Sequence, residues 1–189
     1  MNWLAHLLLS EPNPAFRIGN LLPDLVPMSQ LAQVAPDFRR GIDCHRRIDA
    51  FTDAHPIFRR SVARFPAPFR RFGGVITDVF YDHFLATGWE QFSARPLEDF
   101  AQEIHASFDG HLAGLPPEAC WKLESIRAGR LLTSYRSREG VREALERIGH
   151  RLRRPFDLGA AAALLETHSI EFRGDFAEFF PQLQRFVAG

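Results

Sequence analysis

Proline and glycine divide this sequence into segments of helical length, and that punctuation limits the possible folds more than any other feature. None of the segments shows the sustained alternation of apolar and polar residues that a half-buried strand requires. In the C-terminal segment, apolar residues recur instead at three- and four-residue spacings, which is the period of a helix with one buried face. The sequence therefore predicts an all-α fold.

The predicted helices begin at proline or polar residues and end near the next proline, glycine or polar turn. They cover residues 36–54, 56–65, 75–86, 97–112, 118–135, 137–152 and 158–187, after a short buried helix within residues 1–10. Gly19, Asn20 and Pro23 interrupt the segment RIGNLLPDLV, which is predicted to be a loop or a short, broken helix. No linker or repeat divides the chain, so residues 1–189 are predicted to form a single-domain helical bundle.

The composition is that of an ordinary globular protein, with 46% hydrophobic and 24% charged residues. Because 23 basic residues balance 23 acidic ones, no net charge favours binding to nucleic acid or to an anionic membrane. No apolar stretch reaches the roughly 20 residues of a membrane span, and the first ten residues lack the features of a signal peptide. Cys44 and Cys120 form no metal-binding pair, so we expect a reducing, cytoplasmic location.

The most apolar predicted helix, VITDVFYDHFLA, carries two aspartates four residues apart. Asp78 and Asp82 lie on one face of this helix, and His83 follows Asp82 directly. Carboxylates in such a setting are costly unless a cation pairs with them or coordinates them. Arginines from a neighbouring helix are the ordinary solution, and a metal ion is the alternative.

The segment HRRIDAFTD repeats this pattern, because His45, Asp49 and Asp53 fall on one stripe of a predicted helix. Carboxylates so placed repel each other by roughly 0.2–0.5 kcal/mol. Arg46 within the same helix could pair with Asp49, and Arg47 could likewise pair with an aspartate one turn earlier. However, two helices with the same pattern strengthen the case for a metal. Oxygen and imidazole ligands without thiolates suit Mn²⁺, Mg²⁺ or Fe²⁺ better than a structural zinc ion.

Other catalytic patterns are missing from the sequence. It contains no Glu-x-x-His repeat, HExxH, P-loop or GxGxxG motif, and no GxSxG elbow. Cys44 and His45 are neighbours on a predicted helix, so their side chains point in different directions and do not suit a thiol nucleophile. These exclusions favour metal-assisted hydrolysis.

Four blocks in order, MNWLAHLLLS, GNLLPDLV, GIDCHRRIDAFTD and TDVFYDHFLA, resemble the signature blocks of bacterial acyl carrier protein phosphodiesterases. The similarity continues through LLTSYRS and RIGHRLRRP to FFPQL, and so covers nearly the whole chain. It implies an enzyme that hydrolyses the phosphodiester between 4′-phosphopantetheine and a serine of holo acyl carrier protein, which gives the apo protein. It also implies an all-helical fold similar to that of the HD-type metal phosphohydrolases, and a need for a divalent cation, typically Mn²⁺.

The chain departs from the HD pattern, because it contains no His-Asp dipeptide and only the reversed Asp82-His83. It therefore resembles a non-canonical member of that superfamily. The residue patterns and the resemblance together predict a pool of ligands from which a subset binds one or two metal ions. This pool comprises His6, Asp24, His45, Asp49, Asp78, Asp82 and His83. The predicted catalytic residues are Asp24, His45, Asp49, Asp78 and Asp82, with Asp53 expected to orient a ligating imidazole.

Several arginines are candidates for binding the substrate. The guanidinium groups of Arg46 and Arg47 suit a phosphodiester, although pairing with aspartates of their own helix is an equal alternative. Acyl carrier proteins are acidic, so further arginines are predicted to steer that partner into place. These are Arg59, Arg60, Arg70 and Arg71. Two other functions stay open: an HD-like phosphohydrolase acting on a nucleotide or other small phosphodiester, and a non-enzymatic helical interaction module.

Overall fold

The computed structural model describes residues 1–32 and 34–189, and every regular element in this part of the chain is a helix. The α-helices are α1 (Trp3–Leu8), α2 (Pro14–Leu25), α3 (Met28–Leu31), α4 (Pro36–Ala54), α5 (Pro56–Val62), α6 (Gly73–Thr87), α7 (Leu97–Ser107), α8 (Pro117–Ala128), α9 (Leu131–Ser134), α10 (Arg138–Arg151), α11 (Ala162–Thr167) and α12 (Ser169–Ala188). Three short 3-10 helices are η1 (Arg70–Phe72), η2 (Trp89–Gln91) and η3 (Gly159–Ala161). The all-α prediction is confirmed.

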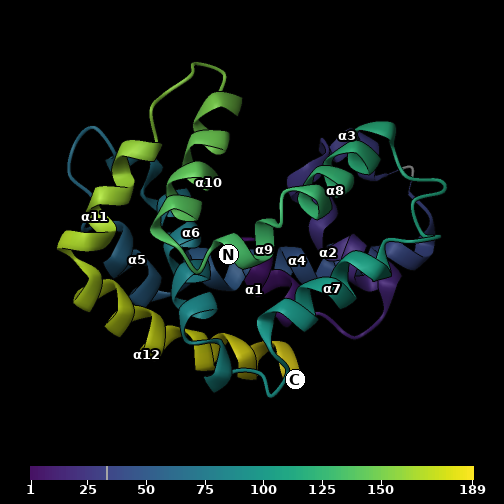
Figure 1. Ribbon diagram of the computed structural model, residues 1–189, viewed down its shortest axis with the longest axis horizontal. Coiled ribbons are helices and arrows are strands. Elements are labelled where there is room, and N and C mark those ends of the chain that lie inside the picture. Colours follow the sequence, from purple (N-terminus) through teal and green to yellow (C-terminus); the bar gives the residue numbers. More distant parts are fainter. Residues whose placement is uncertain (33) are drawn as a thin grey trace.

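Helix α6 lies at the centre of the packing. It contacts α1, α5, α10 and α12, and most of its side chains are buried (Figure 1). This agrees with its sequence, which is apolar on most sides. In Figure 1, α5, α10, α11 and α12 lie on one side of the view, α2, α3, α7 and α8 lie on the other, and α1 lies between them.

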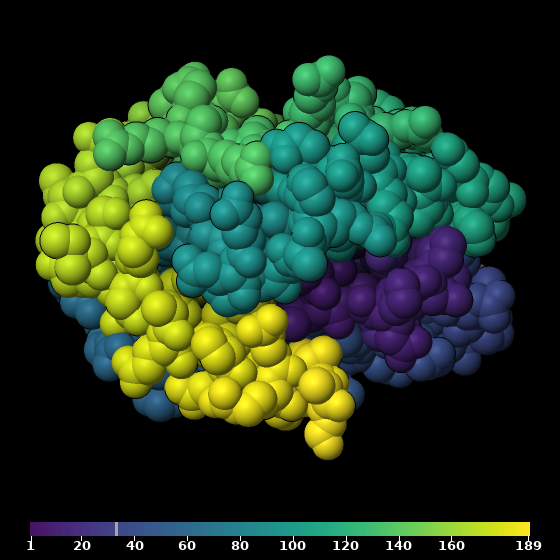
Figure 2. All heavy atoms as spheres, turned by 60° about the horizontal axis from the view of Figure 1, so that its bottom comes forward, coloured from purple at the N-terminus to yellow at the C-terminus, as the bar shows by residue number. Residues whose placement is uncertain are grey.

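Helix α12 covers one face of the molecule. Phe176 and Phe180 on α12 pack edge-on against Phe92, which follows η2, and Phe172 packs against Phe80 of α6. Figure 2 shows the yellow surface of α12 meeting the teal surface of the segment after α6. The apolar period of the C-terminal segment is thus used to bury one face of α12.

Helices α2 and α4 cross with their backbones in contact, because glycines occupy the crossing point. A Cβ atom added at Gly19 would lie 2.2 Å from the carbonyl oxygen of Phe38, and one at Gly41 would lie 2.1 Å from that of Phe16. Only glycine allows so close an approach at these two positions. The crossing brings Asn20 and Asp24 of α2 beside the middle of α4.

The prediction of a loop or broken helix at RIGNLLPDLV is wrong, because α2 is continuous from Pro14 to Leu25. The Asn13 side chain caps its start by accepting a hydrogen bond from the backbone N–H of Phe16 (2.9 Å). Pro23 lies in the last turn, where its missing N–H removes a single intrahelical hydrogen bond. The proline is therefore tolerated, and Asp24 is held on a helix.

Several other predicted helices are longer than the helices in the structure. The helix predicted for 97–112 ends at Ser107, and the one predicted for 118–135 divides into α8 and α9. Gly129 ends α8, and Arg130 adopts a left-handed conformation (φ 47°). The helix predicted for 158–187 divides into η3, α11 and α12. Of the described helices, none is both long enough and apolar enough to cross a membrane.

Candidate functional site

Three of the seven candidate ligands meet at one point of the molecule. His6 of α1 and His45 and Asp49 of α4 each offer a ligand atom within 4.8 Å of the other two. The Nε2 atom of His6 lies 3.2 Å from Asp49 Oδ1, and the Nε2 atom of His45 lies 3.0 Å from Asp49 Oδ2. The two imidazole rings stack, with centroids 4.2 Å apart. We call these three residues the histidine–aspartate group.

Asp24 and Asp78 border the histidine–aspartate group. Asp24 Oδ1 lies 3.7 Å from His45 Nε2, while its other oxygen accepts a hydrogen bond from Trp3 Nε1 (3.1 Å). Asp78 Oδ1 is buried, and no side chain or backbone amide in the described part of the chain donates a hydrogen bond to it. Its nearest positive charge is the α-amino group of Met1 at 3.1 Å, which also lies 3.3 Å from Asp49. Three carboxylates and two imidazoles therefore surround one small region.

The hydrogen bonds of His45 require a proton or a metal ion at its Nε2 atom. Its Nδ1 atom lies 2.8 Å from the backbone carbonyl oxygen of Asn20, which can only accept, so Nδ1 carries the proton. The Nε2 atom of the neutral ring is then an acceptor that faces the acceptor oxygens of Asp49. Two acceptors in contact need a proton or a metal ion between them. The nitrogen and oxygen donors gathered here fit a divalent cation.

Electrostatic effects at the group oppose one another. Burial disfavours the charged form of Asp49, but hydrogen bonds from His45 and His6 outweigh it and hold the pKa of Asp49 well below its usual range. Burial raises the pKa of Asp78 to about 6 against the attraction of the Met1 α-ammonium group. Burial lowers the pKa of His6. For His45, burial is outweighed by its hydrogen bond to Asp49 and by the charge of Asp24, so its pKa is raised.

Asp82 and His83 do not join the histidine–aspartate group. Both oxygens of Asp82 accept backbone hydrogen bonds at the start of α1, from the N–H of Leu4 (2.8 Å) and of Ala5 (3.1 Å). His83 points toward α9, where its Nδ1 atom donates to the carbonyl oxygen of Tyr135 (2.7 Å). Asp82 is fully buried, and it anchors the first helix through N–H groups that have no partner within that helix.

This geometry predicts that Asp82 matters for stability. Replacing Asp82 with asparagine turns an amide NH₂ toward one of the two N–H donors of α1, which loses its acceptor. We expect the free energy of unfolding to fall by about 1–3 kcal/mol, measured by urea denaturation. The Mn²⁺ affinity of the folded variant should stay within a few-fold of the original. A stable Asp82→Asn protein that no longer binds Mn²⁺ would show instead that Asp82 is a ligand.

Arg46 and Arg47 have partners away from the histidine–aspartate group. Arg46 pairs with Asp43 (3.6 Å) rather than with Asp49, and Arg47 stacks over the ring of Phe186 (5.3 Å to its centroid) rather than pairing with Asp43. Asp53 is exposed, and its backbone carbonyl accepts a hydrogen bond from Arg59. The predicted ion pairs within α4 are thus replaced by a different set of contacts.

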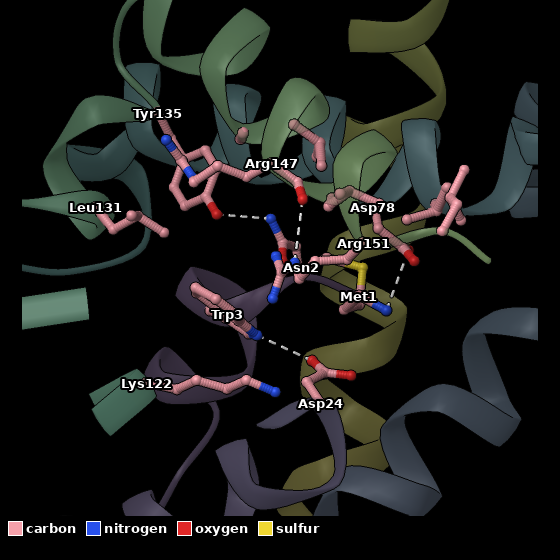
Figure 3. A pocket seen from close by; sticks show the side chains of 15 residues that line it. Met1, Asn2, Trp3, Asp24, Asp78, Lys122, Leu131, Tyr135, Arg147 and Arg151 are labelled. Carbon is pink, nitrogen blue, oxygen red and sulfur yellow. Dashed lines mark hydrogen bonds and ion pairs between the residues drawn. The ribbon is translucent and has the colours of Figure 1, made fainter. Parts of the chain in front are cut away.

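A cavity of about 340 Å³ opens beside the group and is bordered by Asp24 and Asp78 (Figure 3). Lys122 of α8 and Arg147 and Arg151 of α10 also line it. Arg147 Nη2 is buried and has no hydrogen-bond partner among the residues that the structure describes. Sequence reasoning missed these cations, although Arg147 and Arg151 are four residues apart on one predicted helix and so share a face.

Comparisons with known proteins agree on one family. A family model described as acyl carrier protein phosphodiesterase matches residues 1–183. Curated relatives named acyl carrier protein phosphodiesterase include one from Yersinia pestis, 30% identical over 98% of this chain and 96% of the relative. Another from Enterobacter sp. (strain 638) is 32% identical over 97% and 95%, and one from Serratia proteamaculans (strain 568) is 31% identical over 98% and 96%. No solved structure matches the chain, so the likeness to the HD-type fold stays a prediction.

Proposed function

The chain belongs to the acyl carrier protein phosphodiesterase family, and on that premise we propose that it removes 4′-phosphopantetheine from holo acyl carrier protein with the help of a divalent cation. It is a hydrolase that acts on a phosphodiester bond. The reaction adds water across the bond between phosphorus and the serine oxygen, giving apo carrier protein and free 4′-phosphopantetheine. The bound cation, its identity and the residues that hold it are the proposed parts of this account.

One observation carries the proposal: side chains of both charges line the same cavity. Asp24, Asp78 and the adjoining histidine–aspartate group would hold the cation. Lys122, Arg147 and Arg151 supply positive charge around the same space. A phosphodiester is an anion, so it is attracted both to a bound metal and to guanidinium groups. The cavity is also within the size range of small-molecule sites, about 300–1,000 Å³.

The residues take distinct roles in this proposal. His6, His45 and Asp49 hold the metal ion, and Asp24 and Asp78 complete its surroundings. When bound, a divalent cation supplies a water of lowered pKa and polarises the phosphoryl oxygens. Nitrogen and oxygen donors favour Mn²⁺, with Mg²⁺ or Fe²⁺ as alternatives. Arg147 and Arg151 bind the phosphoryl oxygens and keep the substrate in place.

The substrate can be tested directly. Purified protein with Mn²⁺ would be offered holo acyl carrier protein and, separately, bis(p-nitrophenyl) phosphate as a small phosphodiester. We expect kcat/KM to be at least a hundredfold higher for the carrier protein, because docking of a whole protein adds binding energy. A preference for the small ester would support the alternative, an HD-like phosphohydrolase acting on a nucleotide or another small phosphodiester.

We also propose a cytoplasmic location, since both cysteines are free thiols.

We propose that the carrier protein docks on a basic surface next to the cavity. Arg60, one of the predicted steering residues, forms salt bridges with Asp175 and Glu178 and so links α5 to α12. Arg71 instead stacks on Phe156 and, with Arg153 and Arg154, lines a second hollow. Leu152 lines both this hollow and the cavity, so the two are adjacent. We call Arg71, Arg153 and Arg154 the basic rim.

Charge reversal tests the basic rim. We expect Arg154→Glu to lower kcat/KM for holo carrier protein roughly three- to tenfold at low salt, mainly through KM, because the acidic partner is captured more slowly. The difference should shrink at high ionic strength, where charges are screened. Arg185→Glu, in the last turn of α12, is the matched control and should change little. Equal effects of both substitutions would place docking elsewhere.

A further inference from the structure

One fully buried side chain that the proposed reaction does not use touches both imidazoles of the site. Asn20 of α2 is 0% exposed. Its side-chain Oδ1 lies 3.0 Å from Nδ1 of His6, and its backbone carbonyl oxygen lies 2.8 Å from Nδ1 of His45. One residue therefore holds the same ring atom of two histidines that come from two different helices.

The amide orientation of Asn20 is determined by its own donors. Its Nδ2 atom donates to the carbonyl oxygen of His6 (2.9 Å) and to Ser10 Oγ (2.8 Å). Ser10 Oγ in turn donates to the same His6 carbonyl oxygen (2.8 Å). A flipped amide would bring Oδ1 against that carbonyl oxygen, which is repulsive. Oδ1 consequently faces the His6 ring, and because it can only accept, it favours a proton on Nδ1 of His6. The Nε2 atom of the same ring faces a competing acceptor, the carbonyl oxygen of Met1 (3.1 Å).

Asn20 contacts the same ring atom in both histidines. With Nδ1 protonated on His6 and on His45, each neutral ring has its lone pair on Nε2, where a metal ion can take the place of a proton. Both Nε2 atoms point at Asp49, at 3.2 Å and 3.0 Å. A metal ligand needs this lone pair, and a ring in the other tautomer would present an N–H to the metal instead. Hydrogen bonds of this kind fix the tautomer and direction of metal-binding histidines.

We propose that Asn20 is a positioning residue that sets the tautomer of both histidines, so that their Nε2 atoms converge on one metal ion. The inference rests on the proposed function for the identity of the site, and it adds a role that touches neither metal nor substrate. It also explains the close crossing at Gly19 and Gly41, because this crossing brings the Asn20 carbonyl within reach of α4. The side chain acts on His6 and the backbone acts on His45, so the two effects can be separated.

The first test uses the unaltered, metal-free protein. Long-range ¹H–¹⁵N correlation spectra of histidine-labelled protein report which ring nitrogen is protonated, with His6→Gln and His45→Gln proteins used for assignment. We expect Nδ1 to carry a proton in both rings, whether or not Nε2 is also protonated. A His6 ring protonated on Nε2 alone would overturn the inference, whatever the enzyme later proves to hydrolyse.

The second test separates the side chain from the backbone. Asn20→Leu keeps the approximate volume and the backbone carbonyl but removes the acceptor for His6. We expect His6 to show mixed tautomers while His45 stays protonated on Nδ1, and Mn²⁺ affinity, measured by electron paramagnetic resonance of the free ion, to fall about 10- to 100-fold. Asn20→Asp restores the acceptor and should recover the proton on Nδ1 of His6, at a cost in stability because its second oxygen replaces the Nδ2 donor toward the His6 carbonyl oxygen. Ser10→Ala, which removes only the Ser10 hydroxyl, is the matched control and should keep both tautomers.

The outcomes distinguish this inference from the proposed function. If the unaltered protein binds no divalent metal but shows the expected tautomers, the proposed metal site fails and the positioning by Asn20 stands. If Asn20→Leu binds Mn²⁺ as tightly as the unaltered protein with His6 still protonated on Nδ1, the positioning role fails and the metal site stands. Should Asn20→Leu not fold, the spectra of the unaltered and Asn20→Asp proteins decide the question alone.

Discussion

Replacing Asp49 with asparagine is expected to lower the kcat of Mn²⁺-dependent hydrolysis roughly a hundredfold or more. The two oxygens of Asp49 face two different imidazoles, so Asp49 links His6 and His45 in the histidine–aspartate group. Asparagine keeps the shape but removes the negative charge and one of the two acceptor oxygens. Mn²⁺ binding should weaken in parallel, since the site loses its most strongly ionised ligand.

The matched control for Asp49→Asn lies one helical turn away. Asp53 is on the same stripe of α4, but it is exposed. Asp53→Asn should leave kcat and metal affinity within about twofold, because an exposed surface charge has little effect on its surroundings. Full activity of Asp49→Asn, or an equal loss in the two variants, would contradict the assignment of the metal to this group. The assignment is tested by measuring kcat at saturating Mn²⁺ and the Mn²⁺ affinity of both variants.

Gly41→Ala, outside the site, is expected to lower the stability of the protein strongly. The added Cβ would lie 2.1 Å from the carbonyl oxygen of Phe16 and 2.6 Å from the backbone nitrogen of Asn20. These are backbone atoms, which cannot turn aside as a flexible side chain can, so α2 and α4 must separate. We expect a loss of about 3 kcal/mol or more in the free energy of unfolding, measured by urea denaturation.

A second glycine provides the control for Gly41. A Cβ added at Gly74, near the start of α6, meets no atom within 4 Å. Gly74→Ala should leave the protein unchanged or stabilise it by about 0.5–1 kcal/mol, because alanine restricts the unfolded chain more than glycine does. If the Gly41→Ala protein folds with unchanged stability, the close crossing of α2 and α4 is not as described. Any folded fraction of that variant should also bind Mn²⁺ more weakly, since the crossing positions Asn20 against His45.

The sequence was sufficient to predict those parts of the site that lie within one helix. His45 and Asp49 are four residues apart on a long helix, so their meeting follows from helical geometry alone. Asp78 and Asp82 have the same spacing, but they have different surroundings. Asp78 borders the cavity, whereas Asp82 anchors the N-terminal end of α1. What a buried carboxylate contacts depends on the helix packed against it, which the spacing does not specify.

Contacts between distant segments could not be predicted. Lys122, Arg147 and Arg151 reach the cavity from α8 and α10, which no local pattern links to α1 or α4. The helical class of the fold followed from proline and glycine positions, but helix ends depended on local details such as the Asn13 cap on α2. Pro23 does not break α2 as predicted, because a proline in the last turn of a helix removes a single hydrogen bond. The role of Asn20 appears only once three helices are assembled around it.

The proposed reaction is tested most directly by the intact mass of the carrier protein. Purified protein would be incubated with holo acyl carrier protein and Mn²⁺, and in parallel with a chelator, and the carrier followed by mass spectrometry. We expect conversion to the apo mass with release of 4′-phosphopantetheine when Mn²⁺ is present, and no conversion with the chelator. Equal conversion in the chelator would contradict the role of the metal, and no conversion with Mn²⁺ bound would contradict the proposed substrate.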